Sequence, residues 1–110
     1  MELSPLLEAA KKGDLKKVSE LVSQGVDINE TSKNGATALI YAAENSHLNV
    51  VKYLVEEGAD PSLETKMGGT VLSRAAESGN TEMIEYLLKN GAQVGDMALI
   101  VASREGHLNE

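Results

Sequence analysis

The sequence contains no cysteine, phenylalanine or tryptophan, so tyrosine is its only aromatic residue, with three copies in 110 residues. The lack of cysteine excludes disulfides, zinc–thiolate sites and cysteine nucleophiles. It also agrees with a reducing compartment, and we expect a cytoplasmic protein. Because aromatic side chains are scarce, a hydrophobic core has to be built from Leu, Val, Ile, Ala and a few Met.

Long apolar runs and an excess of basic charge are missing as well. No stretch approaches the ~18 apolar residues of a transmembrane helix, and the first residues lack the apolar region of a secretion signal, so we expect no membrane segment. The chain has 10 Lys and Arg against 17 Asp and Glu, a net charge of −7. A protein that binds duplex DNA needs a basic footprint, and this balance therefore disfavours nucleic acid as a partner.

One basic cluster does occur, at Lys11, Lys12, Lys16 and Lys17. A run of like charges is usually a solvated helix face. The alternative is a docking patch for an acidic partner, and the sequence alone leaves both interpretations open.

The sequence is rich in internal repetition. Glycines that end apolar runs recur every 33 residues, as do pairs of alanines: Gly25, Gly58 and Gly91, and Ala9-Ala10, Ala42-Ala43 and Ala75-Ala76. A fixed period of this length indicates units that bury their apolar faces against one another. We therefore predict a stacked solenoid with an all-α fold class.

Each unit has the pattern of two short amphipathic helices. In the second unit Thr37 opens a helix, a turn follows near His47, and Gly58 ends a second helix as the residue after its cap. The apolar residues repeat at helical spacing. The predicted stripes are Leu39, Ala42, Ala43, Val50, Val51, Leu54 and Val55, and in the third unit Leu72, Ala75, Ala76, Met83, Ile84, Leu87 and Leu88. Tyr53 and Tyr86 are interpreted as core, and the segments 25–35 and 58–68 as hairpin-like fingers.

These motifs resemble a known family. The segment TALIYAA at residues 37–43 recurs as TVLSRAA at residues 70–76, and SHLNVV at residues 46–51 leads to GAD at residues 58–60. A helix, a tight turn, a second helix and a finger on this period resemble the ankyrin repeat over essentially the whole chain. The position of that family's signature histidine carries Leu7, Ile40 and Ser73 instead. We expect a single domain, residues 1–110, with units of about 1–30, 31–63, 64–94 and a truncated 95–110.

The fourth unit departs from the period. Leu99 follows Leu72 by 27 residues, and the missing six residues fall where a finger is expected. We predict a single helix over about 97–105, with Asp96 as its N-cap. This helix is either a minimal lid on the third unit, part of a longer array, or a surface for self-association. In the last case the docking residues are found among Ala98, Ile100 and Val101.

The inventory for catalysis is thin, and we predict no catalytic, metal or cofactor site. The two histidines, His47 and His107, occupy the same turn position in units too far apart to share a metal. The glycine clusters match no phosphate-binding loop. Most carboxylates of the second helices fall on the predicted solvent face, so we expect no enzyme.

The resemblance implies instead a protein-binding surface made of the first helices and the finger tips. Stacking leaves this concave side open and free to vary. By register its residues are Lys33, Asn34, Ala36, Tyr41, Glu44, Asn45, Lys66, Met67, Gly69, Arg74, Glu77 and Ser78. Tyr41, Met67 and Arg74 have the chemistry of anchors. As alternatives, Tyr41 packs partly into the core, and Arg74 pairs with Glu44 or Glu77.

The sequence is thus compatible with three kinds of function. The first is an adaptor or scaffold module that binds another protein, whose identity the sequence does not reveal. The second is an inhibitory or effector-like protein that blocks a target enzyme. The third is a non-autonomous part of a longer repeat protein.

Overall fold

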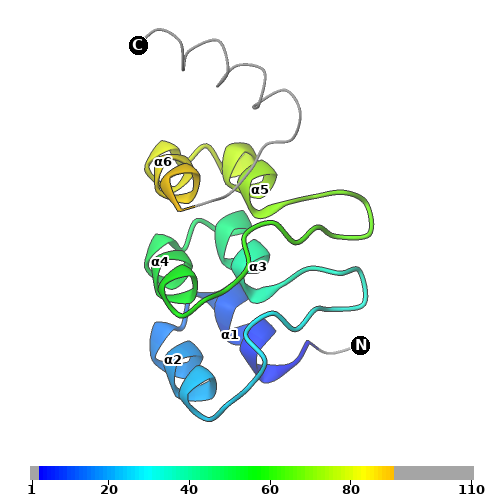
Figure 1. Cartoon of the computed structure of the whole chain (residues 1–110), viewed down its shortest axis with the longest axis vertical. Coiled ribbons are helices and arrows are strands. Elements are labelled where there is room, and N and C mark those ends of the chain that lie inside the picture. Colours follow the sequence, from blue (N-terminus) through cyan, green and yellow to red (C-terminus); the bar gives the residue numbers. More distant parts are fainter. Residues whose placement is uncertain (1–2, 91–110) are drawn as a thin grey trace, which may run out of the picture.

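The computed structural model describes residues 3–90, which form three stacked helix pairs. In chain order the helices of this range are α1 (Pro5–Lys12), α2 (Leu15–Ser23), α3 (Ala38–Glu44), α4 (Leu48–Glu56), α5 (Val71–Ser78) and α6 (Thr81–Lys89). The inner helices α1, α3 and α5 form one column and the outer helices α2, α4 and α6 a second (Figure 1). The predicted all-α solenoid is confirmed, whereas the predictions for Gly91, His107 and the fourth unit lie outside the described residues.

A hydroxyl side chain caps the start of every inner helix. The oxygens of Ser4, Thr37 and Thr70 accept hydrogen bonds from the backbone N–H three residues on, at 3.3, 3.2 and 3.1 Å. At Thr70 the bond is reciprocal, because the Ser73 hydroxyl accepts from the Thr70 N–H at 2.9 Å. Ser73 stands where the family signature has histidine, and here it completes a capping box. The predicted start of a helix at Thr37 is therefore confirmed, whereas the predicted N-cap at Asp96 lies outside the described residues.

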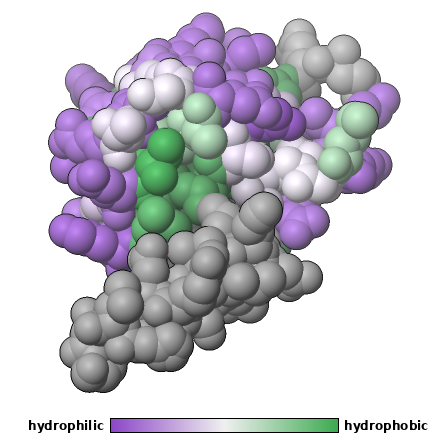
Figure 2. Space-filling model, turned by 90° about the horizontal axis from the view of Figure 1, so that it is seen from above, coloured by the Kyte–Doolittle hydropathy of each residue, from purple (hydrophilic) through white to green (hydrophobic). Residues whose placement is uncertain are grey.

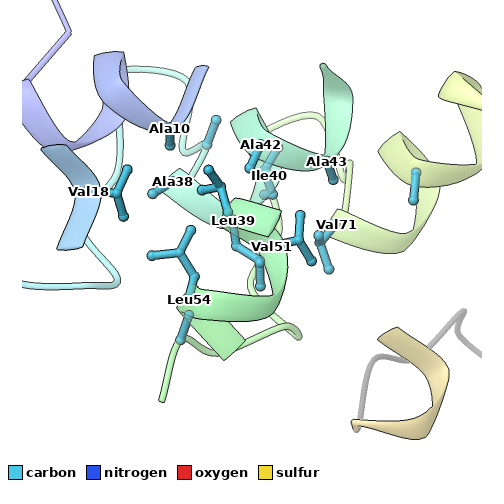
Figure 3. Close-up of a cluster of buried hydrophobic side chains, with 14 of the residues drawn as sticks. Ala10, Val18, Ala38, Leu39, Ile40, Ala42, Ala43, Val51, Leu54 and Val71 are labelled. Atoms are coloured by element: carbon cyan, nitrogen blue, oxygen red, sulfur yellow. The ribbon is translucent and has the colours of Figure 1, made fainter. Parts of the chain in front are cut away.

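Small residues at the contacts between the inner helices let these helices approach closely. Ala10, Ala42, Ala43 and Ala75 are completely buried between neighbouring units. Larger side chains such as Leu39 and Leu54 fill the space between the two columns (Figure 3). Each fully buried Leu or Val contributes roughly 1.5–3 kcal/mol to folding, so the stripes supply most of the driving force.

The predicted stripes hold in the second unit but not throughout the third. Ala76 is exposed, and Leu88 is 49% exposed, although their counterparts in the second unit, Ala43 and Val55, are buried and half-buried. The reason is position in the stack, because α5 covers α3 and α6 covers α4, whereas no later helix of the described range covers α5 or α6. Seen from the end of the stack where α5 and α6 lie, hydrophobic residues gather in a strip beside hydrophilic ones (Figure 2).

The segments that join α2 to α3 and α4 to α5 are the predicted fingers. Each ends in a tight turn, residues 32–35 and 65–68, which we call the finger tips. In each tip the last glycine donates to the carbonyl three residues back, at 2.9 Å in both, and adopts a positive φ. The fingers also pair with each other, since the Lys66 N–H donates to the Asn34 carbonyl at 2.8 Å. Glycine suits this contact, because a Cβ atom on Gly35 would crowd the second finger, at 3.1 Å from the Lys66 nitrogen.

Candidate partner-binding surface

The structure brings the predicted site residues together on the side of the inner helices and fingers. Tyr41, Glu44 and Asn45 lie on α3 or its C-cap, and Arg74, Glu77 and Ser78 occupy the equivalent places on α5. Lys33, Asn34, Lys66 and Met67 form the middle of the two finger tips. Of these ten residues seven are exposed, while Tyr41, Arg74 and Ser78 are half-buried. We call this set the concave surface.

One residue assigned to this surface by register does not belong to it. Ala36 is 3% exposed, because it follows the first finger tip and packs into the core beside α3. Its backbone N–H donates to the Ser32 hydroxyl at 3.2 Å, and the equivalent Gly69 N–H donates to Thr65 at 2.9 Å. Position 36 therefore closes the finger and offers nothing to a partner.

The finger tips present one apolar and several polar side chains to solvent. Met67 is 91% exposed, the most exposed large hydrophobic residue of the described range. Its counterpart Asn34 is polar. A single exposed apolar residue is common on protein surfaces, but here it lies on a protruding tip beside Lys66, where a partner can bury it.

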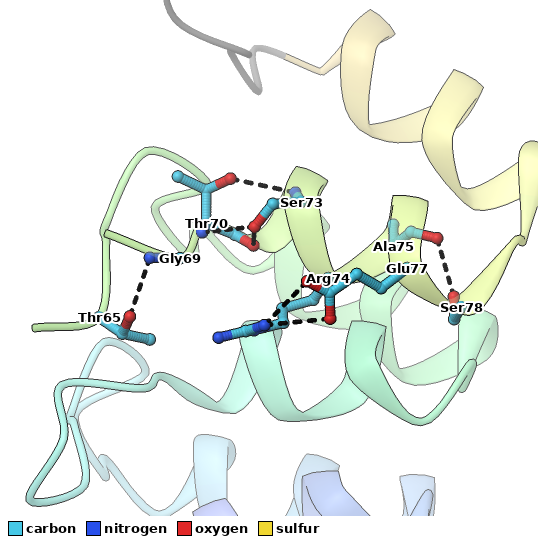
Figure 4. Close-up of polar contacts among 8 residues, drawn as sticks. All are labelled: Thr65, Gly69, Thr70, Ser73, Arg74, Ala75, Glu77 and Ser78. Carbon is cyan, nitrogen blue, oxygen red and sulfur yellow. Dashed lines mark hydrogen bonds and ion pairs between the residues drawn. The ribbon is translucent and has the colours of Figure 1, made fainter. Parts of the chain in front are cut away.

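Arg74 is held in a defined position on the concave surface. Its Nη1 atom pairs with Glu77 Oε1 at 3.1 Å and with Oε2 at 3.2 Å (Figure 4). A Cβ atom on Gly69 would lie 2.7 Å from Arg74 Nη2, so the guanidinium rests against the base of the second finger. Of the two pairings considered for Arg74, the one with Glu77 is observed. The ion pair spans three residues of one helix and leaves the Arg74 side chain 29% exposed.

Tyr41 has both roles considered for it. The half-buried side chain packs against the hydrophobic core. It also lines a groove of about 320 Å³ together with Leu3, Leu7 and the first finger, residues 31–34. The groove therefore offers apolar walls with a polar rim, which suits an aliphatic or aromatic side chain of a partner.

The first unit contributes a part of this surface that the sequence analysis missed. A second hollow, of about 610 Å³, is lined by Leu3, Glu8, Lys11, Lys12 and Asn45. Leu3 lines the groove as well, so the two hollows adjoin. The repeat register could have found these residues, since Glu8, Lys11 and Lys12 lie 33 positions before Tyr41, Glu44 and Asn45. Within the hollow, Lys12 Nζ lies 3.5 Å from Glu8 Oε2.

The basic cluster seen in the sequence is divided between two helices. Lys11 and Lys12 lie in the last turn of α1, next to the hollow, whereas Lys16 and Lys17 lie in the first turn of α2. All four side chains are exposed. Lys12 and Lys17 line one further hollow, together with Leu3, Glu8 and Asp14, so the two halves of the cluster meet there.

The outer helices carry two of the three tyrosines. Tyr53 and Tyr86 pack against the core but stay half-buried, and burial raises the pKa of both phenols, with Glu57 and Glu56 adding to the effect. The Tyr86 hydroxyl donates to the Lys52 carbonyl at 3.4 Å, which links α6 to α4. Tyr53 and Tyr86 thus serve packing at the edge of the core.

Residues 3–90 contain neither a helix suited to a membrane nor a cluster of metal ligands. Among residues 3–90 no helix combines the length and the apolar character that crossing a bilayer requires. In the same range, His, Asp and Glu side chains form no group of three that could hold a metal ion.

Comparison with known proteins agrees with the architecture. A family model described as ankyrin repeats (3 copies) matches residues 6–98 and, in a second match, residues 57–109. A search of curated proteins finds no match to this sequence. The family match spans most of the chain and coincides with the observed helix pairs and fingers. The chain therefore belongs to the ankyrin repeat family.

Proposed function

We propose that this protein is an adaptor or scaffold module that binds a protein partner through its concave surface. Ankyrin repeats are generally protein–protein interaction modules, and the family is generally non-catalytic. The proposal adds to this a specific surface, with Tyr41, Met67 and Arg74 as its main anchors.

One observation carries the proposal. Residues that are spread over four segments of the sequence converge on one accessible surface, and among the three anchors only Tyr41 also packs against the core. Tyr41 walls a groove, Met67 is almost fully exposed, and Arg74 is oriented by Glu77. Aromatic and arginine side chains held in place in this way are typical of the few residues that dominate binding energy.

The test compares two triple variants of the full chain as baits in lysate of the source cell. The first variant, Tyr41→Ala/Met67→Ala/Arg74→Ala, removes the anchors. The control, Lys16→Ala/Glu20→Ala/Glu85→Ala, changes exposed residues of α2 and α6. Circular dichroism first establishes that both variants are folded.

We expect a partner that wild type and control retain, and that the anchor variant recovers at least about tenfold less well, a loss of about 1.4 kcal/mol. Equal recovery by the anchor variant, or loss with the control variant, would place the binding site elsewhere and refute the proposal.

A further inference from the structure

The two adjoining hollows of the concave surface are lined by lysines, and one of them, the groove at Tyr41, also has an apolar wall. Among residues 3–90, three lysines line them, Lys11, Lys12 and Lys33, against a single acidic residue, Glu8. The chain as a whole carries a net charge of −7. The hollows are thus a basic site on an acidic protein.

The acidic residues nearby reduce this charge but leave two of the three lysines without an ion pair to another described residue. Glu8 is already engaged by Lys12 at 3.5 Å, and Glu77 by Arg74 at 3.1 Å. Glu30, at the base of the first finger, keeps its negative charge and accepts a hydrogen bond at 2.7 Å from the hydroxyl of Ser4, which lines the groove. Glu44 and Glu64 are exposed but line neither hollow. Lys11 and Lys33 therefore keep their ammonium groups available, since no ion pair with another described residue engages them.

The donors around the hollows fit a carboxylate. Asn45 donates its side-chain amide to the Tyr41 carbonyl at 2.9 Å, which fixes this side chain at the edge of the hollow that Lys11 and Lys12 line. Lys33 lies on the rim of the neighbouring groove, whose walls are Leu3, Leu7 and Tyr41. An acidic side chain beside Lys11 and an apolar side chain against Tyr41 would thus occupy adjoining spaces, with Leu3 between them.

We infer that the partner presents an acidic segment, with an Asp or Glu that binds beside Lys11 and a neighbouring apolar side chain that enters the groove at Tyr41. This inference rests on the proposed function and adds the chemistry of the partner. The exposed Lys66 of the second finger tip extends the same positive charge along the stack.

A protein segment fits these hollows better than a nucleic acid does. Nucleic-acid binding draws its affinity from many phosphate contacts, and proteins that bind it well neutralise about 6–10 phosphates. The hollows offer three lysines, one of them already paired with Glu8. The apolar wall of the groove has no counterpart in a phosphate backbone, whereas it matches the side chain of a Leu, Ile or Phe.

The experiment selects binders to the full-length chain from a phage-displayed library of random peptides, followed by titration of the selected peptides as synthetic probes. Two charge-reversal variants are compared, Lys11→Glu/Lys33→Glu in the hollows and Lys16→Glu/Lys89→Glu on the outer helices. Both change the net charge equally, which separates local charge from overall charge. Each peptide is also made with its acidic residues replaced by Gln or Asn, and labelled oligonucleotides serve as a further probe.

We expect selected peptides rich in Asp or Glu next to an apolar residue. Their affinity should fall at least about tenfold with Lys11→Glu/Lys33→Glu or with the amide peptides, fall with added salt, and stay unchanged with the outer control. Neutral or basic peptides that bind wild type but not Tyr41→Ala/Met67→Ala/Arg74→Ala would overturn this inference and leave the proposed function standing. Peptides insensitive to both sets of changes would overturn both. Oligonucleotides that bind more tightly than the peptides, through the same lysines, would overturn the inference in favour of nucleic acid.

Discussion

The turn between the two helices of the second unit is built differently from the turns of the first and third units. In the first and third units a glycine takes the left-handed position, Gly13 with φ 78° and Gly79 with φ 75°. In the second unit Ser46 takes this position with φ 60°, the one positive φ of a non-glycine residue in the described range. A side chain in this conformation costs about 1–2 kcal/mol, so the second unit carries local strain that the others avoid.

The residue that follows the turn differs in the same way. Asp14 and Asn80 cap α2 and α6, each by accepting a backbone N–H at 3.1 Å. His47 makes no such cap for α4. Its Nε2 lies 3.0 Å from the Lys11 carbonyl, which can only accept, so Nε2–H is the donor and the bond joins the second unit to the first.

The two kinds of turn stabilise the stack in different ways. A repeat array is stabilised partly within each unit and partly between neighbours. In the turn of the second unit α4 has no side-chain cap and Ser46 is strained, but His47 of the same turn makes a contact to α1. The first and third units keep their local caps, so the second unit depends more on its neighbour than they do.

The largest expected effect tests the contact between His47 and the first unit. We expect Gly13→Ala to destabilise the protein by about 2 kcal/mol, and Gly79→Ala by about 1 kcal/mol. Both variants place a side chain at a positive φ, but only at Gly13 would the new Cβ meet the His47 ring, at 2.6 Å from Nδ1. At Gly79 nothing lies within 4 Å. Urea unfolding of the two variants measures the difference.

A double variant serves as the control for this pair. In a His47→Ala background the ring is gone, and Gly13→Ala should then cost no more than Gly79→Ala does in wild type. If Gly13→Ala destabilises the protein equally with and without His47, the contact between the new Cβ atom and the ring contributes nothing to the loss of stability.

The second effect, of opposite sign, tests the strain at Ser46. We expect Ser46→Gly to stabilise the protein by about 0.5–1 kcal/mol, because relief of the left-handed conformation exceeds the added entropy of glycine in the unfolded chain. No hydrogen bond from the Ser46 side chain to another described residue would be lost. Thermal unfolding should show a melting temperature higher by about 4 °C. Ser78→Gly, within α5, is the matched control and should destabilise. A Ser46→Gly variant no more stable than wild type would mean that the turn is unstrained.

Much of this fold could be predicted from the sequence, because the period itself carries the information. The capping residues Thr37 and Thr70, the glycines after the outer helices and the alanine stripes are local signals, and each repeats. The sequence pattern did not predict how deeply contacts between units bury each side chain. Ala76 and Leu88 follow the same pattern as Ala43 and Val55 but are more exposed, since burial depends on which helix lies next in the stack.

The candidate surface shows the same limit. Register assigned ten residues to this side of the inner helices and fingers, and it also pointed to Glu8, Lys11 and Lys12 of the first unit. Register did not show that Ala36 turns inward, nor that Leu3, ahead of the first helix, lies between two hollows. Those facts depend on how the first finger folds against α1, and no local pattern encodes that.

The smallest effect in global stability is the most informative about coupling between units. We expect His47→Asn to change the free energy of unfolding by less than about 0.5 kcal/mol, because a new cap on α4 offsets the lost bond to Lys11. Amide hydrogen exchange should separate the two contributions, with slower exchange in the first turn of α4 and faster exchange at the end of α1. Asn80, which already caps α6 in the third unit, provides an internal reference for a turn with asparagine at this position.

A uniform change in exchange rates along the chain would contradict the division of stability, since it would mean that the cap and the bond between units are not separable. A faster exchange confined to α1 would instead identify His47 as the residue that holds the first unit, and with it the hollows at Leu3, against the rest of the stack.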